Sequence, residues 1–200
     1  MRSAGIGIIA LIFTFCMPIL TFAGIVGPYT GQVIDSQTGE PIRGASVLIY
    51  WLSGTPSPGG EVTHFMKANL VYTDNKGNYS SPLTLLNTGL LGYLSDTVFI
   101  VYQPGYQGHI VRIFWGPNKP FKQINNVVKL DRIPPNFDHK KHYDNIKEAV
   151  GDMGEVYESP HQARSPYDLV ITWDEMIKIN SQSVPLREEF LRRVAWEGRR

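Results

Sequence analysis

The stretch YTGQVIDSQTGEPIRGASVLIYW, from Tyr29 to Trp51, decides the fold. Its middle, DSQTGEP at 35–41, is rich in turn residues, because Asp and Ser bond nearby backbone groups, Gly39 supplies freedom and Pro41 fixes φ. On its flanks apolar and polar residues alternate, so that Val47 and Ile49 fall on one face of an extended chain. The stretch is therefore interpreted as a hairpin that joins two strands, in preference to a polar loop that binds or cuts a ligand.

Further segments of the first 130 residues have the composition of strands. The run 97–102 is almost wholly apolar, as in a strand buried on both faces, and DNKGN at 74–78 is a turn signal in which Gly77 can take a positive φ. Short strands with such turns predict an antiparallel β-sandwich. Residues 83–94 show no clean period and are expected to form an inserted loop or a short helix. The other two strand candidates are 109–115 and 126–130.

The N-terminal segment has the composition of a targeting sequence. Arg2 precedes a stretch without charge, and the next charged residue is Asp35. Residues 1–23 are predicted to be a signal peptide, which places the chain in the periplasm or cell envelope. The alternative is a membrane anchor over residues 4–26, because about 20 apolar residues span a bilayer. The single cysteine, Cys16, lies in this segment, so a cleaved chain has neither a disulfide nor a cysteine nucleophile.

Charge divides the remainder of the chain in two. Residues 24–130 hold 7 Lys or Arg and 5 Asp or Glu, whereas residues 131–200 hold 11 and 13. The Pro134–Pro135 pair marks the boundary. The second part, 131–200, is predicted to be a charged extension of short helices over 138–150, around a capping box at 172–175, and over 183–196. The apolar stripe of the last helix is expected to dock on the sandwich; the alternative is a basic helix lying on an anionic membrane.

Three motifs carry a family resemblance. The segments 31–47, 73–79 (TDNKGNY) and Gly105–Tyr106 resemble, in this order, signatures of the carboxypeptidase regulatory-like domain, and the resemblance covers about residues 29–130. It implies a transthyretin-like β-sandwich of about seven strands that is non-catalytic and acts as a structural or interaction module. The chain departs from the pattern by the insertions 51–66 and 80–95. The chain is accordingly predicted to be a non-catalytic exported envelope protein.

Neither the net charge nor the motifs of the sequence indicate catalysis. A net charge of +1 gives no reason to expect nucleic-acid binding. None of the five histidines begins a His-x-x-Glu pair, and neither a Gly-x-Ser-x-Gly nor a phosphate-binding loop occurs. We therefore expect no catalytic residue, no cofactor and no metal site, and hence no enzyme. Two weaker alternatives are a metal-dependent hydrolase centred on His139 and His142, and a calcium site of Asp35, Asp74 and Asp96.

Aromatic residues at strand ends suggest a different kind of site. Tyr50, Trp51 and Tyr106 are candidate ligand contacts, because an outward Tyr or Trp can stack on a sugar ring. A carbohydrate-binding module is thus the alternative function. The expected partner is another envelope protein or a glycan, with membrane contact through an uncleaved N-terminus or the basic C-terminal helix as a further alternative.

Overall fold

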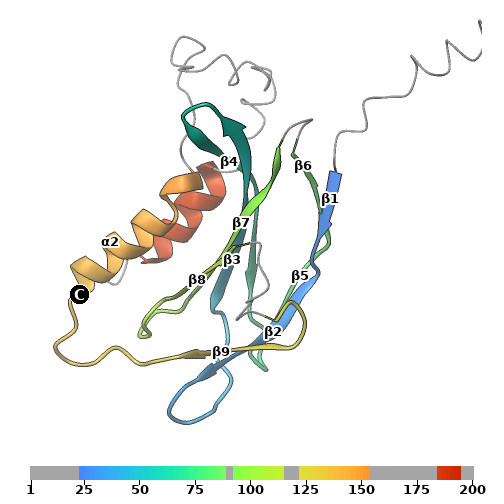
Figure 1. Cartoon of the computed structure of the whole chain (residues 1–200). Coiled ribbons are helices and arrows are strands. Elements are labelled where there is room, and N and C mark those ends of the chain that lie inside the picture. Colours follow the sequence, from blue (N-terminus) through green and yellow to red (C-terminus); the bar gives the residue numbers. More distant parts are fainter. Residues whose placement is uncertain (1–22, 89–91, 115–121, 154–183, 195–200) are drawn as a thin grey trace, which may run out of the picture.

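The computed structural model of the chain describes residues 23–88, 92–114, 122–153 and 184–194 (Figure 1). Within these ranges the protein is mainly β, with short helices in its C-terminal part. The strands are β1 (Ala23–Val26), β2 (Tyr29–Asp35), β3 (Ser46–Ser57), β4 (Gly60–Tyr72), β5 (Asn78–Ser81), β6 (Thr84–Asn87), β7 (Tyr93–Tyr102), β8 (His109–Phe114) and β9 (Asn126–Leu130). The helix α2 (His139–Ala149), the 3-10 helix η1 (Gly151–Met153) and a helix over residues 184–194 follow.

The strands form two layers. One layer is a four-stranded antiparallel sheet in the order β4-β3-β7-β8. The other contains a three-stranded sheet, β5-β2-β9, in which β2 and β5 are joined through short breaks to the β1-β6 pair. The predicted β-sandwich is confirmed, with one difference: β9 runs parallel to β2.

Strand β3 shows why the apolar side chains require a third layer. Because successive side chains alternate across a strand, Val47, Ile49 and Trp51 pack toward the three-stranded sheet. The side chains between them, which include Leu48 and Tyr50, point the other way and pack against the helices. Figure 1 shows α2 and the 184–194 helix together on this second face of the four-stranded sheet. The architecture is therefore helices, sheet, sheet.

Strand β7 confirms the expectation for the 97–102 run. Phe99 and Val101 lie in the core between the sheets, whereas Val98 and Ile100 lie in the core under the helices. All four side chains are fully buried. A strand covered on both faces has no position at which a polar residue is favoured, which explains its nearly continuous apolar sequence.

The two predicted hairpins are correct as turns and wrong in their strand pairing. In the second, the Asp74 carboxylate accepts bonds of 2.8 Å from the backbone N–H groups of Lys76 and Asn78, and Gly77 has a φ of 72°. However, β5 pairs with β2 and not with β4. The turn at 35–41 likewise carries the chain from the three-stranded sheet to the four-stranded one. Local turn chemistry fixes a reversal of direction, but long-range packing selects the strand partner.

Both segments described as insertions contain strands. Residues 51–66 belong to the long β3–β4 hairpin, with a register irregularity after Trp51. Within 83–94, expected to be a loop or short helix, residues 84–87 form β6 and residues 93–94 begin β7. In β6, Thr84 and Leu86 are buried and Leu85 is exposed, so the period is two. The period is hidden in the sequence because the outward position is apolar as well.

The C-terminal part packs on the sandwich. The predicted helix at 138–150 is confirmed as α2: Asp138 caps it by accepting a 2.9 Å bond from the Lys141 N–H, and Ile146 is fully buried. In the 184–194 helix, Phe190 and Val194 are buried against the same core, so docking is confirmed. The apolar stripe of this helix therefore faces protein, and membrane contact by the basic C-terminal end stays a prediction.

Two other predictions concern the ends of the described ranges. The capping box at 172–175 and residues 1–22 lie outside the described part of the chain. Residues Ala23–Val26, which the alternative anchor includes, form β1 instead. Among the described residues, no helix combines the length and the apolar composition that crossing a membrane requires.

Candidate functional site

The predicted aromatic contacts Tyr50 and Trp51 are interior residues. Both side chains are fully buried. Trp51 packs in the core between the sheets, with its ring 6.2 Å from that of Tyr29. Tyr50 points to the helices, where its hydroxyl donates to the backbone oxygen of Ala149. The expectation that these rings face solvent is wrong, because the strand they occupy is covered on both faces.

The third aromatic candidate, Tyr106, belongs to a polar cluster around Asp35. The Asp35 side chain is 1% exposed and accepts bonds from Arg132 Nε at 2.6 Å and from the Tyr106 hydroxyl at 3.0 Å. Its other oxygen accepts from the backbone N–H groups of Gln37 and Thr38 at 2.9 and 3.0 Å. The carboxylate thus ties together the 35–41 turn, the loop after β7 and the segment after β9. With four donors in place, it is a structural link.

Electrostatics agree with this assignment. The Arg132 hydrogen bond is the largest cause that holds the pKa of Asp35 far below the usual range of a carboxyl group, and the Thr38 and Gln37 N–H groups act in the same direction. Burial, followed by the bond to Asp35, raises the pKa of Tyr106. Neither group is placed to exchange a proton near neutral pH. The cluster stabilises the fold rather than offering an acid or a base.

The two metal alternatives find no support in the described residues. His142 Nε2 accepts a 3.3 Å bond from the Gly108 N–H, and the Phe137 ring packs against both His139 and His142. No group of three or more His, Cys, Asp or Glu residues comes together in the part of the chain that the structure describes.

The aspartate alternative fails on geometry as well. Asp35 and Asp74 each cap a turn. Asp96 pairs with Leu52 in the β3–β7 ladder. The Ser46–Tyr102 pair stands at the other end of this ladder. Because three ligands have to surround one ion, these carboxylates do not make a calcium site.

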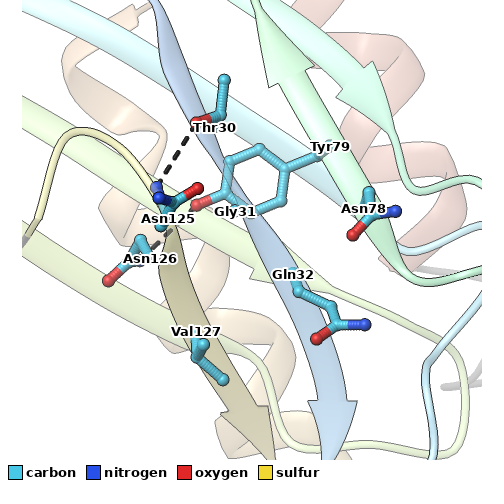
Figure 2. A pocket seen from close by; sticks show the side chains of 8 residues that line it. All are labelled: Thr30, Gly31, Gln32, Asn78, Tyr79, Asn125, Asn126 and Val127. Carbon is cyan, nitrogen blue, oxygen red and sulfur yellow. Dashed lines mark hydrogen bonds between the residues drawn. The ribbon is translucent and has the colours of Figure 1, made fainter.

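The structure does contain a hollow that the sequence did not reveal. It has a volume of about 380 Å³ and lies on the three-stranded sheet, where β2, β5 and β9 run side by side (Figure 2). None of its lining side chains is charged. The lining residues are Thr30, Gly31, Gln32, Asn78, Tyr79, Asn125, Asn126 and Val127.

Glycine at position 31 shapes the hollow. Gly31 stands opposite Tyr79 on one side and opposite Asn126 on the other. A Cβ at this position would lie 2.1 Å from the backbone oxygen of Asn126 and 2.6 Å from the Tyr79 hydroxyl. The absent side chain therefore lets the Tyr79 ring cross β2, as Figure 2 shows, and its hydroxyl meets the Asn126 amide at 3.5 Å.

Three of the four side-chain amides that line the hollow use their donor ends in hydrogen bonds. Gln32 Nε2 donates to Lys76 O at 2.8 Å, Asn78 Nδ2 donates to Asp74 at 3.4 Å, and Asn126 Nδ2 faces the Tyr79 hydroxyl. Within the described part of the chain, the three side-chain amide oxygens have no hydrogen-bond partner. The hollow is thus rich in acceptors and neutral, which suits a ligand that carries several hydroxyl donors.

Sequence reasoning missed the hollow for an identifiable reason. Its residues come from three segments, 30–32, 78–79 and 125–127. Each segment lies more than 40 residues from the next. The available signal was the row of amide and hydroxyl residues at these strand positions, in particular Thr30, Gln32, Asn78 and Asn126. That signal has meaning only once β2 is known to pair with both β5 and β9.

Comparisons with known proteins identify no family. No protein-family model matches the chain, and no curated protein matches it either. The carboxypeptidase regulatory-like resemblance is not tested by these results and stays a prediction.

Among solved structures, partial matches occur in dioxygenases. A catechol 1,2-dioxygenase from Acinetobacter radioresistens is 19% identical over 56% of this chain and 53% of its own, with a TM-score of 0.36. A 3-chlorocatechol 1,2-dioxygenase from Rhodococcus opacus 1CP is 13% identical over 56% and 60%, with a TM-score of 0.35. The mercury-inhibited catechol 1,2-dioxygenase of Acinetobacter sp. ADP1 is 17% identical over 58% and 54%, with a TM-score of 0.37. The chain matches little more than half the length of each.

This comparison corrects the expectation of a non-catalytic chain. That expectation, and with it the prediction that the protein is not an enzyme, came from the family resemblance and the missing motifs. The solved structures named above are enzymes, and the prediction of a non-catalytic chain is corrected accordingly. At these identities and TM-scores the likeness carries no argument about chemistry, and no dioxygenase activity is assigned.

Proposed function

We propose that the protein binds a neutral, hydroxyl-rich ligand, a glycan of the cell envelope, in the hollow on the three-stranded sheet. The single observation that carries this proposal is the set of three amide oxygens, of Gln32, Asn78 and Asn126, that line an uncharged hollow of about 380 Å³ without an internal partner in the described residues. Sugar hydroxyls donate well to such oxygens. The proposal concerns binding and assigns no reaction.

The size of the hollow fits such a ligand. About 380 Å³ lies toward the lower end of the range of ligand pockets, roughly 300–1,000 Å³, and is enough for one or two sugar rings. The half-buried Thr30 and the exposed Val127 flank the amides, so the hollow offers both a polar and an apolar surface. Pyranose rings present the same combination.

The predicted export of the protein is consistent with a ligand of the envelope. Residues 3–34 contain no charged residue, and Arg2 precedes them, as in a secretory signal or an anchor. With its only cysteine at position 16, the rest of the chain is independent of the redox state of its compartment. An exported domain encounters glycans directly.

Removal of two acceptors tests the proposal. The full-length chain is screened against an array of neutral oligosaccharides, and the best ligand is measured by calorimetry with the wild type and with the Gln32→Leu/Asn78→Leu variant. Each neutral hydrogen bond contributes about 0.5–1.5 kcal/mol, so the loss of two bonds is expected to weaken binding by a factor of about 5 to 150. The matched control is Gln37→Leu, which removes an exposed amide on the 35–41 turn and is expected to bind as the wild type does.

Two results would contradict the proposal. One is the absence of binding to any neutral oligosaccharide by a folded wild-type chain. The other is equal affinity of the wild type and the double variant, since binding would then use another surface. Circular dichroism of each variant establishes that the β-sandwich has folded before affinities are compared.

A further inference from the structure

The outward face of the β1–β6 pair is apolar, although an outward sheet face is normally polar. Ile25 is 71% exposed, and Leu83 and Leu85 are each 62% exposed. Ile25 and Leu85 stand directly opposite one another in the antiparallel ladder, and Leu83 comes just before β6. In an antiparallel sheet with one face on the core, the other face usually carries polar residues. These three residues are called the β1–β6 apolar face.

The inward side of the same pair is ordinary core. Thr84 and Leu86 of β6 are buried, and Leu86 belongs to the core between the sheets. The register therefore has no freedom to turn Ile25 and Leu85 inward, because a shift by one residue would expose Leu86. The β1–β6 apolar face is a fixed feature of the fold.

The two sequence segments that form this face contain no charged residue. Residues 3–34, which include β1, have no charged side chain, and neither do residues 77–95, which include β6. Over the remainder of the chain charges recur far more often. A surface that meets a soluble partner protein usually has a polar and charged rim, whereas a surface at a bilayer is favoured when charge is absent.

The sequence next to β1 is itself suited to lipid. Residues 4–22 are uncharged and rich in Ile, Leu and Phe, and their length is close to the roughly 20 residues that span a bilayer. Ile25 follows Phe22 by three residues, which is about 10 Å of extended chain. If 4–22 enters lipid, the β1–β6 apolar face lies within about 10 Å of the hydrocarbon, which is comparable to the depth of the headgroup region.

We propose that the β1–β6 apolar face rests on the lipid bilayer, with residues 4–22 retained as the adjoining anchor. The sandwich is then held against the membrane by one end, through Ile25, Leu83 and Leu85. The hollow lies on the three-stranded sheet, into whose strands β2 and β5 the β1–β6 pair continues. The occupant is lipid and not a second copy of the chain.

Site-specific fluorescence tests this contact in the full-length chain. Cys16 is the only cysteine, so a Cys16→Ser background accepts a single label at Leu85→Cys or, across the ladder, at Ile25→Cys. The labelled chain is reconstituted into vesicles of phosphatidylcholine and phosphatidylglycerol, with and without brominated lipid as a quencher. Both labels are expected to show a blue-shifted emission and to lose intensity when the quencher is present. The matched control is Val127→Cys, an exposed apolar position on β9, which is expected to show neither change.

Three results would overturn the proposal. The labels at Leu85→Cys and Ile25→Cys could emit at the wavelength of a water-exposed dye when the chain is in detergent-free vesicles. That result would show that the face is in water. A blue shift that depends on protein concentration and ignores the brominated lipid would show that a second copy covers the face. Equal quenching at Val127→Cys would show that the label, not the face, seeks the lipid.

Discussion

Asp35 shows how one side chain can organise several segments. Its two carboxylate oxygens receive four hydrogen bonds, two from the backbone of its own turn and one each from Tyr106 and Arg132. The turn role was predictable, because Asp favours a position two residues before the N–H groups it binds. The two long-range partners, 71 and 97 residues away, were not, because nothing local encodes them.

The Asp35→Asn variant is expected to be less stable, in a way that depends on pH. The pKa of Asp35 is lower in the folded chain than the 3.8 of a free side chain, so its charge stabilises the fold above about pH 4. That contribution is lost as pH falls through the depressed pKa. Urea unfolding should therefore show a large difference between wild type and variant at pH 7 and a smaller one at pH 2.5.

The control for this prediction is Asp144→Asn, an exposed position on α2. It should change stability little at either pH. A difference between wild type and Asp35→Asn that is the same at both pH values would mean that the carboxylate acts through its shape and not through its charge.

Thr73 is a second residue whose role is long-range. Its hydroxyl accepts a 2.8 Å bond from the Ala45 N–H and donates a 2.7 Å bond to Ile42 O, all in a buried position. Thr73→Val keeps the shape and removes both bonds. We expect a loss of about 1–3 kcal/mol in the free energy of unfolding, because two buried backbone groups lose their partner. Denaturant titration measures the loss, and the exposed Thr63→Val variant is the control. Equal stability of the two variants would show that the Thr73 hydrogen bonds do not stabilise the fold.

At the scale of elements, the 184–194 helix completes the cover of the four-stranded sheet. Phe190 is fully buried, with its ring 6.3 Å from that of Tyr102. Arg193 lies 4.5 Å over the Tyr72 ring and donates a 2.9 Å bond to Gly44 O. The apolar stripe of this helix and its docking could be predicted from the sequence. The sheet face that the helix covers could not be predicted.

Phe190→Ala is expected to loosen this element and to lower the free energy of unfolding by about 3–5 kcal/mol, as for other buried Phe residues. Chemical denaturation followed by tryptophan fluorescence measures the change. Arg192→Ala, at an exposed position on the same helix, is the control and should have an effect of less than about 0.5 kcal/mol. A similar small effect for Phe190→Ala would mean that the helix does not dock in solution.

Strand β6 illustrates a different limit at this scale. Residues 83–87 read LTLLN, in which an inward and an outward apolar residue follow one another. Sequence periodicity detects a strand only when its two faces differ in polarity. The β1–β6 apolar face removes that difference. The feature that concealed the strand is the one that the bilayer proposal explains.

For the whole molecule, the three-layer arrangement decides where a ligand can bind. Helices cover one face of the four-stranded sheet and the second sheet covers the other, so every aromatic side chain on β3 is interior (Figure 1). The three-stranded sheet of the other layer carries the hollow. The β1–β6 apolar face and the hollow thus belong to one layer, and the helices to the opposite side.

The sequence by itself determined the β class of residues 29–130, the turns at 35–41 and 74–78, helix α2 and the docking stripe of the last helix. These features depend on periodicity, turn chemistry and capping, which act within a few residues. The parallel β2–β9 pair, the burial of Tyr50 and Trp51, and the hollow between Gln32, Asn78 and Asn126 were decided only by the tertiary structure. They depend on which distant strands become neighbours, and that choice follows from packing the whole apolar surface at once.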